Sequence, residues 1–423
     1  MSLIKFVHAA DLHLDSPFSG IRGIAPEIAT TLYQATFGAY DRLINLCIEE
    51  GVDALLVAGD VFDGADRSLR AQIKFGEGLK RLAEAGIRSF VCHGNHDPLN
   101  GWEAQLALPL GCYRFGPHVE RIPVFTEEPD RAVVYGISYP QREVRDNLIA
   151  RFGKVESGVF SIGLIHANVG NNADHAPYAP CSLNDLANTG IDYWALGHVH
   201  TRQILHQAHP TVIYPGNPQG RHPNERGARG VYLVDVSDSG QVHADFRPVD
   251  VVRWDVLQMN IGALETEQAL FNAIEEEVVA CQSAADGRSL VVRIVLHGRG
   301  PLHGTLHRQG FVDDLLESVN RTWTLQHPFV WCERIQLATA SPFDRASRRQ
   351  GTDFLGDLLR LCDALRENPG MLSEMRELLH ELYMRGNTMR YLRESLPTDE
   401  ELRVFITEAE ELGVEELLDE ESE

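Results

Sequence analysis

The sequence predicts an α/β (α+β) protein, in which a two-sheet sandwich flanked by helices is followed by a small α/β domain and a helical C-terminal region. Three observations support this prediction. Strand-like apolar runs alternate with helical patterns up to about residue 250, the same alternation then restarts, and the last part is helical. A chain of 423 residues is also long enough for two or three domains. We therefore expect domains at residues 1–250, 251–345 and 346–423.

The first domain contains one especially clear helix. Pro26 suits its first turn and Gly51 suits its end. Its apolar positions recur at spacings of three and four, at Tyr33, Phe37, Tyr40, Ile44 and Cys47. Later strand-like runs come without long helices between them, at Ala132–Ile137, Thr211–Tyr214 and Gly230–Val236. We therefore expect the second half of this domain to be a largely antiparallel sheet that packs against the first half.

The two following domains show simpler patterns. The small domain alternates strands and helices, at Val256–Ile261, Glu265–Ala280, Leu290–Leu296, Phe311–Val319 and Cys332–Leu337. In the C-terminal region an apolar stripe predicts one helix, at Phe354, Leu358, Leu361 and Leu365. Pro369-Gly370 breaks this helix. Further helical stretches follow, at Leu372–Met384 and Asp399–Leu412.

Composition and charge indicate an ordinary cytoplasmic protein. The net charge is -23, and residues 353–423 alone carry 20 acidic residues against 7 arginines. Seven scattered cysteines form no CxxC pair, which favours reduced thiols in the cytoplasm over a disulfide framework. The sequence shows no signal-peptide pattern and no run that approaches the roughly 20 apolar residues of a membrane span. We therefore expect no membrane partner.

Five short polar blocks each follow a strand-like run. They contain aspartate, asparagine and histidine but no cysteine, at Asp11, His13, Asp60, Asp63, Asn95, His96, His166, His198 and His200. Such oxygen and imidazole groups are ligands for ions of the Mn²⁺, Fe or Zn type. A lone D-x-H or H-x-H is more often a turn or a satisfied histidine pair, but the ordered set at strand ends predicts a two-metal phosphoesterase.

Hydrolysis of a phosphate diester needs a hydroxide, charge compensation and help for the leaving oxygen, and two ions can supply the first two. Asp60 is the candidate for the bridging carboxylate. His96 follows Asn95, and adjacent side chains diverge in an extended chain, so His96 is free for acid chemistry. Asp63 could hold its other ring nitrogen and keep it protonated. For Asp97, a turn or cap role is favoured over a catalytic one.

The stretch from His198 to Val234 is the basic part of this acidic chain. Its single acid is Glu225, and its arginines are Arg202, Arg221, Arg226 and Arg229. These arginines could hold substrate phosphates beside the metals. The alternative is a solvated arginine-rich loop.

With these motifs, the sequence resembles the calcineurin-like metallophosphoesterase superfamily, whose pattern runs D-x-H, G-D-x-x-D, G-N-H-[DE], H, G-H-x-H. Within it, the chain is most similar to DNA-repair exonucleases of the SbcD type, particularly the bacterial subgroup similar to YhaO. Residues 10–18 resemble the opening motif of that subgroup, and residues 214–219 resemble its Y-P-G-[SN]-x-Q element, followed by Glu225. The resemblance is specific over residues 1–250 and holds in outline over 251–345.

The resemblance implies a ligand set and a reaction. It places Asp11, His13, Asp60 and His200 on one ion, and Asp60, Asn95, His166 and His198 on the other. It makes His96 the histidine that faces the phosphate, with Asp63 behind it. It implies two divalent ions, most often Mn²⁺, and exonucleolytic or endonucleolytic cleavage of DNA.

The resemblance also implies a partner, an SMC-like ABC ATPase with a long coiled coil. The chain has no G-x-x-x-x-G-K-[ST] loop, so an ATP-driven step must come from another subunit. The helical region 346–423 is the natural docking element. The alternatives are that these helices complete the fold or form a homodimer.

Two other classes of function stay open. One is a phosphodiesterase or phosphatase that acts on nucleotides or other small phosphoesters, and it is disfavoured because a small substrate has less need of the domains after residue 250. The other is a protein-binding scaffold with a vestigial metal site, and the full ligand set with His96 argues against it. The chain has only four lysines, so on DNA its arginines would have to supply the cations.

Overall fold

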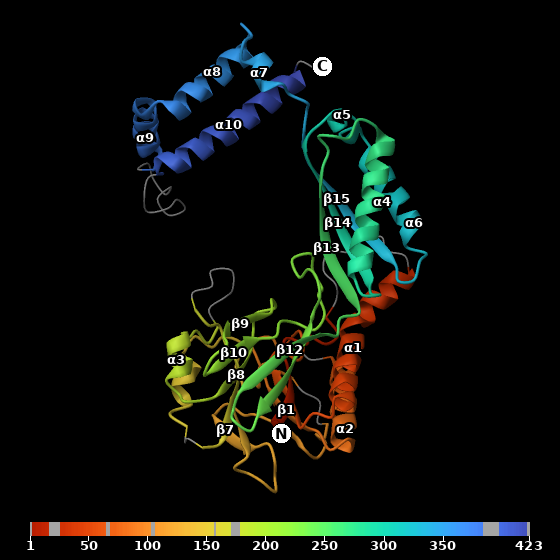
Figure 1. Ribbon diagram of the computed structural model, residues 1–423, viewed down its shortest axis with the longest axis vertical. Coiled ribbons are helices and arrows are strands. Elements are labelled where there is room, and N and C mark those ends of the chain that lie inside the picture. Colours follow the sequence, from red (N-terminus) through yellow and green to blue (C-terminus); the bar gives the residue numbers. More distant parts are fainter. Residues whose placement is uncertain are drawn as a thin grey trace. The chain divides into compact units, whose positions relative to one another are not determined.

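The computed structural model describes residues 2–16, 26–64, 68–102, 106–155, 158–170, 178–383 and 397–420. Pro17 and Phe18 of the opening motif and Met384 of a predicted helix lie outside these ranges. Two six-stranded sheets form the centre of the N-terminal part of the chain (Figure 1).

The first sheet has the strand order β12-β11-β1-β2-β3-β4. Its strands are β1 (Ser2–Ala9), β2 (Ala54–Ala58), β3 (Arg88–Cys92), β4 (Cys112–Arg114), β11 (Gly230–Ser237) and β12 (Val242–Pro248). Strands β1 to β4 run parallel. Strand β11 pairs antiparallel with β1, and β12 pairs antiparallel with β11. The carboxyl ends of the parallel strands therefore meet at one edge of the sheet.

The second sheet has the strand order β5-β6-β7-β8-β10-β9. Its strands are β5 (Glu120–Pro123), β6 (Ala132–Gly136), β7 (Phe160–His166), β8 (Tyr193–Gly197), β9 (Gln203–His206) and β10 (Thr211–Tyr214). The four central strands are parallel, and only the two edge strands are antiparallel.

The expectation of a largely antiparallel second sheet was therefore wrong. Short segments suffice to bring the chain back between its parallel strands, namely the 3₁₀ helix η1 (Leu148–Arg151), helix α3 (Leu183–Ala187) and strand β9. The absence of long helices thus did not imply antiparallel pairing. The predicted run at Gly230–Val236 belongs to the first sheet, as strand β11.

The two sheets pack face to face around a fully buried core. Phe6 and Leu56 of the first sheet share one cluster with Ile162 of the second. The neighbouring residues Val7 and Leu55 belong to a different cluster, which includes helix residues. This alternation is what a strand with a period of two produces when both of its faces are covered.

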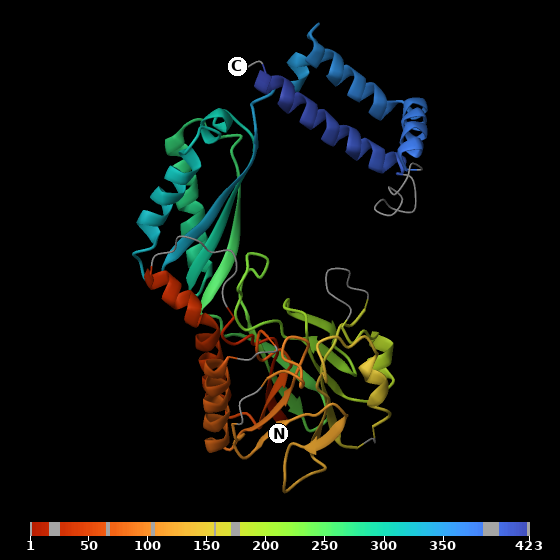
Figure 2. The ribbon, with the colours of Figure 1, turned by 180° about the vertical axis from the view of Figure 1, so that it is seen from behind.

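Helices α1 (Pro26–Glu49) and α2 (Leu69–Glu84) cover the outer face of the first sheet and contact each other (Figures 1 and 2). Tyr40 of α1 is fully buried, and its hydroxyl donates to the carbonyl of Phe75 at 2.8 Å. On the outer face of the second sheet, Trp194 and Leu196 pack with Phe152. These layers confirm the two-sheet sandwich flanked by helices.

A three-stranded sheet follows, with the order β13-β14-β15. The elements are β13 (Val252–Asn260), α4 (Glu267–Ala284), β14 (Ser289–Arg299), α5 (His303–Leu306), α6 (Phe311–Trp323) and β15 (Val330–Ala340). They confirm the small α/β domain, with longer strands than the sequence predicted. The chain divides into two compact units, one being residues 1–257, 277–293 and 317–334, and the other 258–276, 294–316 and 335–423. The boundaries near residues 250 and 345 stay predictions.

The C-terminal region is helical, as predicted. Its helices are α7 (Arg345–Arg348), α8 (Phe354–Glu367), α9 (Pro369–Tyr383) and α10 (Asp399–Glu420). Helices α8 and α10 lie side by side (Figures 1 and 2). The predicted apolar stripe was right in part. Leu358 and Leu365 pack against the helical core, whereas Phe354 and Leu361 are exposed. The buried positions of α8 are Leu355, Gly356, Leu359 and Cys362. Across the described residues, no helix is long and apolar enough to cross a membrane.

Candidate metal centre

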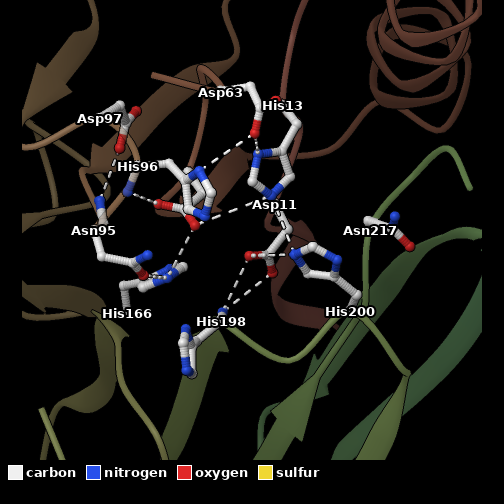
Figure 3. A network of polar contacts seen from close by, with 12 residues as sticks. Asp11, His13, Asp63, Asn95, His96, Asp97, His166, His198, His200 and Asn217 are labelled. Carbon is white, nitrogen blue, oxygen red and sulfur yellow. Dashed lines mark hydrogen bonds and ion pairs between the residues drawn. The ribbon is translucent and has the colours of Figure 1, made fainter. Parts of the chain in front are cut away.

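Most of the predicted ligands come together where strands of both sheets end, whereas the ring nitrogens of His198 belong to none of the described groups of ligand atoms (Figure 3). Asp11 and His13 follow β1, Asp60 follows β2, and Asn95 follows β3 in the first sheet; His166 ends β7, while His198 and His200 follow β8 in the second. The backbone N–H groups of Asp11 and His13 donate to the carbonyls of Gly59 and Asp60, both at 3.0 Å. These bonds hold the first two polar blocks against each other.

Four of these residues have backbone conformations that L-amino acids rarely adopt. The φ angles are 52° at Asp11, 42° at His13, 48° at Asp60 and 105° at His198. Each such residue costs on the order of 1–3 kcal/mol and persists only where the surroundings hold it. Strained residues of this kind concentrate at functional sites. The four positive angles therefore support a functional role for this edge of the sheets.

Two glycines of the polar blocks allow the blocks to approach closely. A Cβ atom at Gly94 would lie 2.3 Å from Asp60 Oδ1, and one at Gly197 would lie 1.8 Å from the carbonyl oxygen of Ala58. Both distances are shorter than any real contact. Glycine at these positions is therefore required by the packing of the strand ends.

The first group of ligand atoms consists of Asp11, His13 and His200. Nε2 of His13 lies 3.1 Å from Nε2 of His200, and Oδ1 of Asp11 lies 3.8 Å from the latter. Burial is the largest influence on His13 and lowers its pKa, which favours a neutral ring.

The opposite ring nitrogens of these two histidines each face a carboxylate. Nδ1 of His13 lies 3.0 Å from Asp63 Oδ1, and Nδ1 of His200 lies 2.7 Å from Glu225 Oε1. Because a carboxylate only accepts hydrogen bonds, Nδ1 of His200 donates its ring proton to Glu225. The Nε2 atoms of His13 and His200 are thereby turned toward each other, an arrangement that a divalent cation between them would stabilise.

The second group of ligand atoms consists of Asp60, Asn95 and His166. His166 donates from Nδ1 to the carbonyl of Ala58 at 3.0 Å. Its Nε2 atom therefore faces two acceptors, Asn95 Oδ1 at 3.1 Å and Asp60 Oδ2 at 3.3 Å. Burial acts to lower the pKa of His166, but the charge of Asp60 outweighs it and raises this pKa to about 9. The site thus attracts positive charge, and a metal ion in it would replace the proton.

Asp60 lies between the two groups of ligand atoms. Its Oδ2 atom is 3.3 Å from Nε2 of His166 and 4.0 Å from Nε2 of His13. The backbone N–H of His198 donates to both carboxylate oxygens of Asp11, at 3.2 and 3.1 Å, and its ring centroid lies 5.2 Å from that of His166. Asp11 also belongs to both groups, so the donor set fits two neighbouring divalent ions.

His96 occupies the open side of the centre. Its side chain is 37% exposed, and its backbone N–H donates to Asp60 Oδ1 at 3.0 Å. Its Nδ1 atom lies 3.3 Å from Asp63 Oδ1. The bond to Asp63 is the largest influence on His96 and raises its pKa, so the ring can hold a proton. His96 also forms, with His13 and Asp63, one of the groups of side chains that could hold an ion.

Asp97 has a structural position. It is fully buried and accepts hydrogen bonds from the backbone N–H groups of Gly94 and Val61, both at 2.9 Å. Its Oδ2 atom also lies 2.8 Å from Nδ1 of His93. These bonds tie the block after β3 to the block after β2.

The four candidate arginines separate into two pairs. Arg221 and Arg229 are 13% and 8% exposed and serve internal contacts. Nη1 of Arg221 lies 3.5 Å from Asp63 Oδ1, and Nη1 of Arg229 donates to Asn217 Oδ1 at 3.0 Å. Arg202 and Arg226 are exposed. The second pair is therefore open to solvent, whereas the first pair is largely buried.

Sequence reasoning missed the role of Glu225, which supports His200 and also accepts from the backbone N–H of Arg221 at 2.7 Å. It also missed Ser16, whose hydroxyl donates to Asp63 Oδ2 at 2.6 Å. The available signal for Glu225 was its place as the single acid in the arginine-rich stretch.

A two-sheet sandwich that gathers aspartate, histidine and asparagine at its strand ends defines a metallophosphoesterase. Residues 4–202 match the family model of the calcineurin-like phosphoesterases, and residues 254–340 match that of the middle domain of the metallophosphoesterase YhaO. The chain is 37% identical over 337 residues to the uncharacterized metallophosphoesterase YhaO of Bacillus subtilis, which covers 79% of this chain and 82% of that protein. The chain therefore belongs to the YhaO-like family of calcineurin-like metallophosphoesterases, and it is a phosphoester hydrolase.

More distant relatives include proteins named for DNA repair and nuclease function. The DNA double-strand break repair protein Mre11 of Sulfurisphaera tokodaii is 25% identical over 317 residues, covering 71% of this chain and 75% of that protein. A subunit of the nuclease SbcCD of Bacillus subtilis is 26% identical over 313 residues, covering 64% of this chain and 74% of that protein.

Proposed function

We propose that this protein is a Mn²⁺-dependent phosphodiesterase that acts on DNA, as the exonuclease or endonuclease subunit of a repair system. The observation that carries the proposal is the pair of opposed Nε2 atoms of His13 and His200, beside an exposed His96 that Asp63 supports. The names of the Mre11 and SbcCD relatives support DNA as the substrate.

The proposed ligands form two sets that share Asp60. One ion would be held by Asp11, His13, Asp60 and His200, and the other by Asp60, Asn95, His166 and His198. When bound, two such ions supply a hydroxide nucleophile at neutral pH and offset the negative charge that develops on the phosphate.

The protein's own groups complete the reaction. Asp63 holds Nδ1 of His96, so Nε2 is the ring nitrogen left for a substrate. A protonated His96 can donate a hydrogen bond to a phosphate oxygen and then its proton to the leaving oxygen. Ser16 and Arg221 contact Asp63 as well, so this carboxylate stays in place and ionised.

We also propose an SMC-like ABC ATPase as the partner, with the C-terminal helices as its docking element. Several large apolar side chains of these helices are exposed to solvent, which supports a protein-binding surface; they are Phe354, Leu361, Leu378, Phe405 and Leu412. Completion of the fold or self-association are the other possible uses of these helices.

The experiment that tests the nuclease is an assay of Mn²⁺-loaded protein on duplex DNA, single-stranded DNA, cyclic nucleotides and bis(p-nitrophenyl) phosphate side by side. We expect loss of linear DNA, no cleavage by His96→Ala, and nearly unchanged manganese content in that variant by elemental analysis. His118→Ala, which changes an exposed histidine away from the centre, is the control. Rapid hydrolysis of the small diesters without loss of DNA would mean that the substrate is a small phosphoester and not DNA. A protein that is inactive on every substrate and binds no manganese would overturn the proposal that it is a Mn²⁺-dependent enzyme.

A further inference from the structure

A separate cavity of about 170 Å³ adjoins the metal centre. Its wall includes His200, three arginines (Arg202, Arg226 and Arg229) and the ring of Phe246 from β12. His200 therefore contributes both to the metal centre and to the wall of this cavity. Its Nε2 atom faces the ligand atoms of Asp11 and His13, while other atoms of the residue line this cavity.

The cavity concentrates positive charge in a chain whose net charge is -23. None of its described lining residues is acidic. Arg202, Arg226 and Arg229 form no ion pair with any residue that the structure describes. Three guanidinium groups without carboxylate partners form a site for an anion, because each can give charge-assisted hydrogen bonds to phosphate oxygens.

Arg202 is held in place by an aromatic ring. Its guanidinium carbon lies 3.9 Å from the ring centroid of Phe246, and Phe246 packs edge-on against Tyr232 at 5.7 Å. Stacking fixes one face of the guanidinium and leaves its N–H edges available. An arginine that is ordered in advance loses less conformational entropy when it binds a ligand.

Arg229 connects the cavity to the metal centre. It is 8% exposed, and it donates to the carbonyl of His200 and to Oδ1 of Asn217, which Figure 3 places beside the His200 loop. Its Nε atom is buried and has no hydrogen-bond partner among the described residues. A buried charged donor without a partner is costly, and an anion in the cavity would relieve that cost.

We propose that this cavity is a subsite for the phosphate that neighbours the scissile phosphate in a polynucleotide. The inference rests on the proposed function and deepens it, because it names what distinguishes the substrate from a small diester. A substrate with two adjacent phosphates engages the metal centre and the arginine subsite together. A single phosphodiester engages only the metal centre.

The first test measures binding without metal. A fluorescently labelled thymidine pentanucleotide is titrated with metal-free protein at several salt concentrations. We expect Arg226→Gln and Arg202→Gln each to raise Kd about tenfold. Each should also reduce the slope of log K against log salt by about 0.7, which is the value for one phosphate contact on a single strand. Arg145→Gln, an exposed arginine paired with Glu143, is the charge-matched control and should change neither quantity.

The second test compares substrates with the Mn²⁺-loaded enzyme. For Arg226→Gln, the ratio of kcat/KM on the pentanucleotide to kcat/KM on bis(p-nitrophenyl) phosphate should fall about tenfold, mainly through KM. Thymidine dinucleotides with and without a terminal phosphate show whether a terminal or an internal phosphate occupies the subsite.

The two proposals fail in different ways. If wild-type protein cleaves DNA and Arg226→Gln behaves like Arg145→Gln in both tests, the proposed subsite is wrong and the proposed nuclease activity is unaffected. If wild-type protein hydrolyses bis(p-nitrophenyl) phosphate but no oligonucleotide, the DNA substrate is overturned together with the subsite.

Discussion

His13 and His96 share one carboxylate oxygen. Oδ1 of Asp63 lies 3.0 Å from Nδ1 of His13 and 3.3 Å from Nδ1 of His96. A proposed metal ligand and the proposed acid are therefore oriented by the same group. Ion binding and acid chemistry should respond together when this group is changed.

Asp63→Asn should impair both functions of the centre. The amide lacks the charge that raises the pKa of His96 and orients His13, so we expect kcat and Mn²⁺ affinity each to fall roughly 10- to 100-fold. Manganese titrations and steady-state kinetics measure the two effects. In a His96→Ala background the substitution should still weaken manganese binding, through His13. Unchanged affinity in that background would contradict the shared role, and Asp130→Asn, at an 84% exposed side chain, is the control.

Glu225→Gln should affect the metal centre mainly through His200. Weaker orientation of the His200 ring should lower Mn²⁺ affinity roughly 10- to 100-fold, and excess Mn²⁺ should restore most of kcat. The measurement is kcat as a function of Mn²⁺ concentration. Glu143→Gln, at an exposed surface pair, is the matched control. A loss of kcat that excess metal does not restore would argue against this limited role.

Removal of metal should destabilise the folded protein. The proposed ligands come from both sheets, so Mn²⁺ should bind the folded chain only, and at 100 times its Kd it should add about 2.7 kcal/mol to the free energy of unfolding. Differential scanning calorimetry with Mn²⁺ and with a chelator measures this as a shift of Tm. Asp60→Asn should lose the shift, whereas Asp130→Asn should keep it. Equal shifts in both variants would mean that Mn²⁺ binds elsewhere.

His8 should make stability depend on pH. It is fully buried between Tyr193 and Leu196, and burial lowers its pKa from 6.5 to about 3. Between these two values the unfolded chain binds a proton that the folded chain does not, so the free energy of unfolding decreases as pH falls below 6.5, by up to about 1.4 kcal/mol per pH unit.

Urea unfolding at pH 7, 6 and 5 tests this expectation. His8→Asn should lower the urea midpoint at pH 7, because it disturbs buried packing, but its midpoint should then fall less with acid than that of the wild type. His118→Asn, at an exposed histidine, should follow the wild type. Parallel pH curves for the wild type and His8→Asn would contradict the assignment.

Much of the fold was predictable because local signals agreed with the tertiary structure. Pro26 and Gly51 bracket helix α1 as expected, and the strand-like runs became strands of the two sheets. The relative direction of the strands in the second sheet, parallel or antiparallel, was not predictable. It depends on the connections between the strands, which the periodicity of an apolar run does not encode. The partial success of the predicted stripe of α8 has a similar cause: which of its apolar residues are buried is decided by the later helices α9 and α10.

The proximity of the predicted ligands followed from short motifs at strand ends, since parallel strands bring their carboxyl ends together. Their assignment as ligands stays a prediction. The residues that support them were harder to find. Glu225 reaches His200 from 25 positions away, and no spacing rule connects the two. The positive φ angles of Asp11 and Asp60 were also invisible in the sequence, because neither residue type requires them.

The contact of His166 with Ala58 joins the two sheets at the same edge where the ligands meet. Any motion that moves the two sheets apart at this edge would also separate the side chains that the proposed cations need together. Substitutions that alter substrate preference should therefore be tolerated better in the surrounding loops than at the contact between the sheets. Laboratory evolution of this protein should accordingly accumulate its tolerated substitutions in those loops.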